Sequence, residues 1–185
     1  MANRIFKTLL EQGTHEVGVL NSSQSRDIVN GAKLTGGDLD NFLLVEDAGW
    51  DEDGRLCKAL SDNTKKGFLV TTIEEESLFA DEEFLQGNYR DFYNAEGEFV
   101  KLTLLEAYVT RFETSAFTKD SGVTGDITRG MVAHYDHATK KYIVSKSASS
   151  ANSGYSAAAN KFEVVDVNTD FGYNVGVPTI RLEAR

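Results

Sequence analysis

The sequence has few of the residues that cross-link or stiffen a chain. Its 185 residues include one cysteine, Cys57, and one proline, Pro178. A single cysteine excludes an intrachain disulfide and a zinc site with several thiolate ligands. We expect Cys57 to pack as a small, partly buried apolar residue. With so little proline, turns must come from Gly, Asn and Asp, and no Pro-rich linker divides the chain.

Long apolar runs and positive charge are also scarce. No stretch reaches the ~18 apolar residues of a membrane span, and the opening MANRIFKTLL lacks the apolar region of a secretory signal. Lys and Arg total 19 against 29 Asp and Glu, so the formal net charge is -10 at pH 7. Phosphate backbones are bound by clustered Lys and Arg. The composition therefore predicts contact with neither membranes nor nucleic acid.

The sequence does have β patterning. Hydrophobic residues make up 41% of the chain, enough for a core, and runs rich in Val, Ile, Thr, Tyr and Phe alternate with Gly, Asp and Asn turns. This predicts a mainly β fold with minor α, namely a β-sandwich or small β-barrel-like body with short helices in the N-terminal half. We expect an N-terminal arm or short helix (1–16), a β-rich region with an acidic segment (17–93) and a β-rich C-terminal body (94–185). These parts can also form one continuous domain.

Turn signals divide the N-terminal half into small strands and hairpins. They lie at Gly36-Gly37, Asp53-Gly54 and Asp62-Asn63. Residues 74–98 carry nine acidic side chains and one basic side chain, with a short helix expected around Glu76–Gln86.

Five strands are predicted in the C-terminal body: the long strand Phe99–Thr110, the hairpin of Ile127–Tyr135 with Lys141–Lys146, and the strands Phe162–Val167 and Val175–Glu183. Pro178 lies inside the last of these, which predicts an edge strand or a bulge. Ser145–Asn160 is small and polar, so we expect a long exposed loop suited to contact with a partner.

Two motifs could hold a metal ion. His134-Tyr135-Asp136-His137 offers three ligands, but strand alternation would direct the two imidazoles to opposite faces, and a hairpin turn is the favoured interpretation. Asp51-Glu52-Asp53-Gly54 is similar to part of a calcium loop, although its end positions fall on Gly49 and Leu60, which cannot supply the carboxylates. We interpret it as an Asp-Gly hairpin turn.

No motif for nucleophilic or nucleotide chemistry is present. The sequence contains no Gly-x-Ser-x-Gly element and no phosphate-binding glycine pattern. It therefore predicts no catalytic, cofactor-binding or metal-binding residue, no cofactor and no enzymatic activity. A hydrolase that uses His134, Asp136 or His137 is a third, weaker alternative.

Aromatic residues suggest one further alternative. Tyr89, Phe92, Tyr93 and Phe99 either cap a sheet core or, with exposed Trp50 and Tyr155, form a platform on which a sugar stacks. The second possibility predicts these rings in an open groove.

The C-terminal half resembles the auxiliary capsid proteins of tailed bacteriophages, which are decoration or cement proteins and head-fibre bases. The segments that carry the resemblance are Asn94–Leu105, Phe112–Phe117, Gly125–Ser145, Phe162–Val167 and Gly176–Leu182. The opening MANRIFKTLL is also similar to small phage structural proteins. The resemblance implies a β-rich body made in the host cytoplasm and carried on the capsid exterior. It also implies the major capsid protein as partner and a homo-oligomer, with a trimer favoured.

The leading hypothesis is therefore a non-enzymatic virion structural protein that binds and stabilises the capsid shell. We expect its contacts to involve Ala2–Leu10 and Ser145–Asn160. The alternative is a carbohydrate- or receptor-binding β module of a phage tail or fibre.

Overall fold

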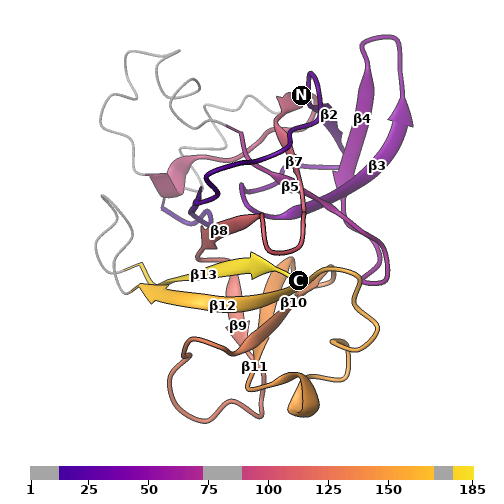
Figure 1. The fold of residues 1–185 in the computed structure, drawn as a ribbon. Helices are drawn as coiled ribbons and strands as arrows, with labels where there is room; N and C mark the ends of the chain where they lie inside the picture. Colours follow the sequence, from indigo (N-terminus) through magenta and orange to yellow (C-terminus); the bar gives the residue numbers. More distant parts are fainter. Residues whose placement is uncertain (1–12, 73–88, 169–176) are drawn as a thin grey trace.

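The computed structural model describes residues 13–72, 89–168 and 177–185. As predicted, the fold is mainly β, with two sheets stacked one above the other in Figure 1. Within the described ranges the only helical segments are two 3-10 turns, η2 (Tyr89–Asp91) and η3 (Ala148–Ser150). The predicted helices at the N-terminus and around Glu76–Gln86 lie outside the described residues.

One sheet has seven strands in the order β1-β8-β13-β12-β10-β11-β9. Their bounds are β1 (Gly18–Leu20), β8 (Arg111–Thr114), β13 (Thr179–Ala184), β12 (Lys161–Asn168), β10 (Val132–Asp136), β11 (Lys141–Ser145) and β9 (Phe117–Lys119). All neighbours are antiparallel except β9 and β11, which run parallel.

The other sheet has six strands in the order β6-β2-β4-β3-β5-β7. Their bounds are β6 (Phe99–Val100), β2 (Ala32–Thr35), β4 (Arg55–Ala59), β3 (Leu44–Trp50), β5 (Phe68–Val70) and β7 (Leu102–Leu104). Only Lys101 separates β6 from β7, the first and last strands of this order, and Asp27 just before β2 bridges to Thr103 of β7. The sheet therefore curls almost into a barrel.

Both sheets combine strands from before and after residue 93. β1 pairs with β8 in one sheet, and β2 with β6 and β5 with β7 in the other. One buried hydrophobic cluster also contains residues of both sheets. The three-part division of the chain stays a prediction.

Aromatic rings form the centre of that cluster. Phe112 of β8 lies 5.4 Å from Tyr142 of β11 and 5.6 Å from Phe162 of β12, measured between ring centroids. The Tyr142 hydroxyl donates a hydrogen bond of 2.8 Å to the carbonyl oxygen of Phe42, which lies just before β3. Because strand side chains alternate between faces, these rings share the inner side of the seven-stranded sheet, and one hydrogen bond ties them to the other sheet.

Two of the hairpins predicted from turn chemistry are confirmed, whereas the turns at Gly36-Gly37 and Asp62-Asn63 connect strands that are not neighbours in the sheet. β10 and β11 pair in register around the turn Asp136–Lys140. At the tip of the β3–β4 hairpin, which projects to the upper right in Figure 1, the Asp51 carboxylate accepts hydrogen bonds from the backbone N–H groups of Asp53 and Gly54. The acidic turn therefore uses Asp51 to close the backbone.

Two strand predictions are wrong in part. Phe99–Thr110 is divided into β6 and β7, which pair with different strands, and the chain then turns, with Thr110 N–H donating to Glu106 O. The last strand begins at Thr179, after Pro178, and β13 lies between β8 and β12 inside the sheet, not at its edge. Proline lacks the N–H that an interior strand must donate, so it precedes the paired residues.

Candidate functional site

Residues 146–160, called here the covering loop, connect β11 to β12 and lie over the outer face of β10. Ala133 and Tyr135 belong to the core cluster, so His134 between them points to the opposite face. There the ring of Tyr155 meets the His134 ring edge-on, with centroids 6.0 Å apart. Lys161 Nζ lies 5.2 Å from the centre of the Tyr155 ring. The loop therefore leaves His134 only 1% exposed.

The first half of the covering loop is fixed by Asn152. Its backbone N–H donates to Ser145 Oγ at 3.1 Å, and its side-chain amide donates to Asp120 Oδ1 at 3.2 Å. Asn152 Oδ1 in turn accepts a hydrogen bond from Gly154 N–H at 2.9 Å. These contacts give a loop without regular structure a defined path.

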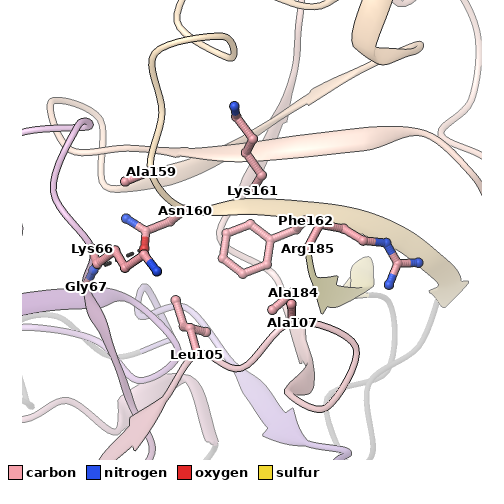
Figure 2. A pocket seen from close by; sticks show the side chains of 10 residues that line it. All are labelled: Lys66, Gly67, Leu105, Ala107, Ala159, Asn160, Lys161, Phe162, Ala184 and Arg185. Carbon is pink, nitrogen blue, oxygen red and sulfur yellow. Dashed lines mark hydrogen bonds between the residues drawn. The ribbon is translucent and has the colours of Figure 1, made fainter.

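The second half is fixed to the six-stranded sheet by Asn160. Its Oδ1 accepts a hydrogen bond from Gly67 N–H at 3.0 Å (Figure 2), and its Nδ2 donates to the carbonyl oxygen of Lys65 at 2.7 Å. Next to it, Ala159 N–H donates to Asn63 O at 2.8 Å. The sequence predicts a long exposed loop, but Ala158 and Asn160 are buried. Its exposed part includes residues 148–150, called here the crest of the loop.

A small cavity lies beside Asn160. It has a volume of about 120 Å³, and Leu105, Phe162 and Arg185 are among the residues that line it (Figure 2). Small-molecule sites usually measure ~300–1,000 Å³. This cavity is therefore a gap between packed segments and not a substrate pocket.

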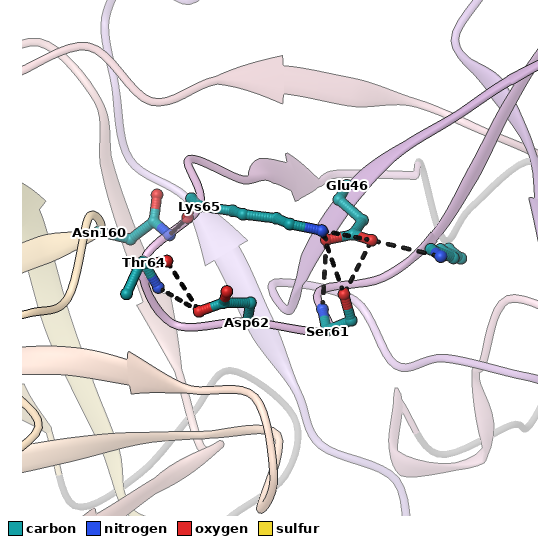
Figure 3. Close-up of polar contacts among 7 residues, drawn as sticks. Glu46, Ser61, Asp62, Thr64, Lys65 and Asn160 are labelled. Atoms are coloured by element: carbon teal, nitrogen blue, oxygen red, sulfur yellow. Dashed lines mark hydrogen bonds and ion pairs between the residues drawn. The ribbon is translucent and has the colours of Figure 1, made fainter.

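The segment that Asn160 binds is itself held by Glu46 of β3 (Figure 3). Lys65 Nζ lies 3.1 Å from Glu46 Oε2, Ser61 Oγ donates to Glu46 Oε1 at 2.9 Å, and Lys58 lies 3.4 Å away. Burial alone would raise the pKa of Glu46, but the hydrogen bonds from Ser61 and the two lysines outweigh it and lower this pKa to about 2. Glu46 is thus ionised at neutral pH and holds the Ser61–Lys65 segment in place.

The two histidines of the metal-like motif have separate environments. His134 is covered by the loop, and burial lowers the pKa of its imidazole. His137 Nδ1 lies 2.9 Å from Asn63 Oδ1, and Asp136 accepts hydrogen bonds from Asn63 and from Thr139. Among the described residues no three His, Cys, Asp or Glu side chains are grouped to hold a metal ion. These residues shape the β10–β11 turn.

Of the rings predicted to form an aromatic platform, two are buried, while Phe99 of β6 is 51% exposed. Phe92 and Tyr93 are only 4% and 1% exposed, whereas Trp50 is 68% exposed on the projecting hairpin, with Arg55 Cζ 4.8 Å from its ring centre. Tyr155 packs on His134. The Tyr89 side chain and the segment Ala2–Leu10 lie outside what the structure describes.

Cys57 also differs from its predicted state, since it is fully and not partly buried. Burial, with the nearby Asp47, raises the pKa of the Cys57 thiol to about 12. The thiol therefore packs in the core as a small apolar side chain.

Sequence reasoning missed the residues that position the covering loop. Asn63, Asn160 and Glu46 act through contacts with residues distant in the sequence: Asn160 and Gly67, for example, are 93 positions apart. No local pattern marks them. The one available signal was that a long loop in a compact fold is often functional and therefore held in place.

Taken together, the fold and these contacts define a two-sheet β protein whose described polar clusters hold loops and turns. In the part of the chain that the structure describes, no helix is long and apolar enough to cross a membrane.

Comparison with known proteins then identifies the family. The chain belongs to the YonC prophage protein family, whose model matches residues 11–185. It is 42% identical to the uncharacterized SPbeta prophage-derived protein YonC of Bacillus subtilis (strain 168), over 184 residues that cover 99% of this chain and 98% of that protein. No solved structure matches the chain.

Proposed function

We propose that this protein is a non-enzymatic structural protein of a phage virion, bound to the major capsid protein on the outside of the shell. In this role it acts as a decoration or cement protein that stabilises the capsid. Its prophage family supports a phage role, and the capsid assignment follows from the resemblance of its C-terminal half to auxiliary capsid proteins. No cofactor takes part in this role.

The observation that carries the proposal is the covering loop. It is held at Asn152, Tyr155 and Asn160, and apart from Lys146 its exposed residues are all small. These small residues are Ala148, Ser149, Ser150, Ser153, Ser156 and Ala157. Small side chains lose little rotamer freedom on contact and let another backbone approach closely. A loop already fixed in its bound form also loses less entropy on binding.

Binding to capsids that lack the protein tests this proposal. The expected result is saturable, stoichiometric co-sedimentation and a higher temperature of capsid disruption. Ser150→Arg, on the crest of the covering loop, should weaken binding, because a long charged side chain blocks close approach. Glu52→Arg makes the same kind of change at the exposed tip of the β3–β4 hairpin and should bind as the wild type does.

The proposal fails if capsids neither bind the protein nor gain heat resistance. If both variants bind equally well, the contact assigned to the covering loop is wrong, whereas the capsid role itself is judged by the wild-type result.

A further inference from the structure

A polar groove beside Tyr108 has the composition of a sugar site, and we propose that it binds a carbohydrate. It lies between the segment that follows β1 and the turn that precedes β8, with a volume of about 380 Å³. Its main lining residues are Asn21, Ser23, Gln24, Tyr108, Val109 and Arg111. The volume falls within the ~300–1,000 Å³ of small-molecule sites. This inference does not rest on the capsid proposal.

Tyr108 is presented to the groove in an unusual backbone conformation. Its φ is 63°, in the left-handed region that a bulky side chain adopts only at a cost in free energy. The conformation is held by a hydrogen bond of 2.9 Å from Tyr108 N–H to Ala184 O. The Arg185 guanidinium carbon lies 4.7 Å from the ring centre. The residue is nevertheless 75% exposed, so its side chain is held by these contacts and remains accessible to a ligand.

The opposite wall of the groove supplies hydrogen-bonding groups. Ser22 Oγ donates to Arg111 O at 3.1 Å and accepts from Arg111 N–H at 2.7 Å, which joins the two walls. Asn21 Oδ1 is buried and has no hydrogen-bond partner among the described residues. A buried acceptor without a partner costs free energy that a hydroxyl donor would recover.

These features favour a sugar over other small ligands. The C–H face of a pyranose packs on the electron-rich face of an aromatic ring, while its hydroxyls bond to amide and hydroxyl groups. An apolar ligand would require an apolar lining, whereas here only Val109 and the Tyr108 ring are apolar. A phosphate would require an available cation, but the Arg111 guanidinium already donates through Nε and Nη2 to Glu183.

Saturation-transfer difference NMR on the full chain tests the inference. The probes are glucose, galactose, rhamnose and N-acetylglucosamine, with short oligomers of each. At least one should receive saturation at its ring C–H protons. Tyr108→Ala should weaken that binding about tenfold, the size of a lost ring contact, and Tyr108→Phe should retain it. Asn21→Ala should weaken it by a smaller factor.

Trp50→Ala is the matched control, because Trp50 is another exposed ring stacked by an arginine, on the distant β3–β4 hairpin. It should leave binding unchanged. The inference is overturned if no sugar receives saturation, or if Tyr108→Ala binds as tightly as the wild type. Should Tyr108→Ala fail to fold, Asn21→Ala decides: binding equal to that of the wild type refutes the site.

Discussion

At the scale of single residues, Glu46 shows how a buried charge is maintained. Only 6% of this residue is exposed, yet its carboxylate accepts hydrogen bonds from Ser61 and lies within ion-pair distance of Lys58 and Lys65. A buried carboxylate is tolerated only when its oxygens are paired in this way. The same contacts keep the pKa of Glu46 at about 2, below its ordinary value of 4.5.

Glu46→Gln should therefore lower the free energy of unfolding at pH 7 by about 1–3 kcal/mol, the range for hydrogen bonds to a charged group. A carboxyl group whose folded pKa is depressed stabilises the fold fully above its unfolded pKa. For Glu46 this contribution is lost as the pH falls from its ordinary 4.5 to about 2. Urea unfolding at a series of pH values checks both effects.

Glu46→Gln should lose less stability than the wild type as the pH falls from 4.5 to about 2. Glu52→Gln, at the exposed hairpin tip, is the control and should change stability little at pH 7. An unchanged pH dependence in Glu46→Gln would contradict the role assigned to this carboxylate.

The groove beside Tyr108 shows why some residues of a candidate binding site cannot be predicted from the sequence. Tyr108 lies in the stretch Phe99–Thr110, whose composition predicts a strand, but the structure places it in a turn with φ 63°. Its conformation depends on contacts with Ala184 and Arg185, more than 70 positions away. Local propensity does not contain such information.

At the scale of elements, the covering loop depends on Asn160. This one side chain makes two hydrogen bonds to the backbone of the Lys65–Gly67 segment, and that segment is held by Glu46. Attachment of the loop and order of the six-stranded sheet are thus coupled through the Asn160 side chain, next to the bond from Ala159 N–H to Asn63 O.

Asn160→Ala should release the second half of the covering loop. The buried Gly67 N–H and the part-buried Lys65 carbonyl oxygen lose their partner, so we expect a loss of about 1–3 kcal/mol in stability and faster cleavage within residues 146–160. Limited proteolysis followed by mass spectrometry measures the cleavage. Ser149→Ala, on the exposed crest, should be cleaved at the wild-type rate. Equal cleavage of wild type and Asn160→Ala would show that Asn160 does not anchor the loop.

Elements defined by local turn chemistry could be predicted, whereas those defined by distant pairing could not. Asp53-Gly54 and the Asp136–Lys140 turn determine their hairpins within a few residues, and both hairpins are found. The division of Phe99–Thr110 at Lys101 reflects the near-closure of the six-stranded sheet, where β6 and β7 pair with different strands. Neither the near-closure of the six-stranded sheet nor the central position of β13 in the other sheet can be predicted from a short segment of the sequence.

At the scale of the whole molecule, the net charge affects how identical subunits associate. Each chain carries a formal net charge of -10 at pH 7, so subunits of a homo-oligomer repel one another at low ionic strength. Salt shortens the range of this repulsion to ~8 Å near 0.15 M. Any self-association must overcome the repulsion through contacts at close range.

We therefore expect the proposed trimer to form more completely as salt is raised. Sedimentation equilibrium should give a mass near three times the 20.4 kDa of one chain at 0.5 M NaCl and a lower average mass in dilute buffer. A single-chain mass at both salt concentrations would contradict the trimer, while leaving the capsid proposal to its own test.

The position of β13 has a consequence for how the protein is made. Residues 179–184 insert between β8 and β12, which leave the ribosome earlier. Until they arrive, β8 and β12 each present an unpaired edge, the kind of surface on which nascent chains aggregate. Pairings between residues so distant in sequence also form slowly. The seven-stranded sheet can thus be completed only after residues 179–184 have been made, and a chain interrupted before residue 179 should be a substrate for chaperones and proteases.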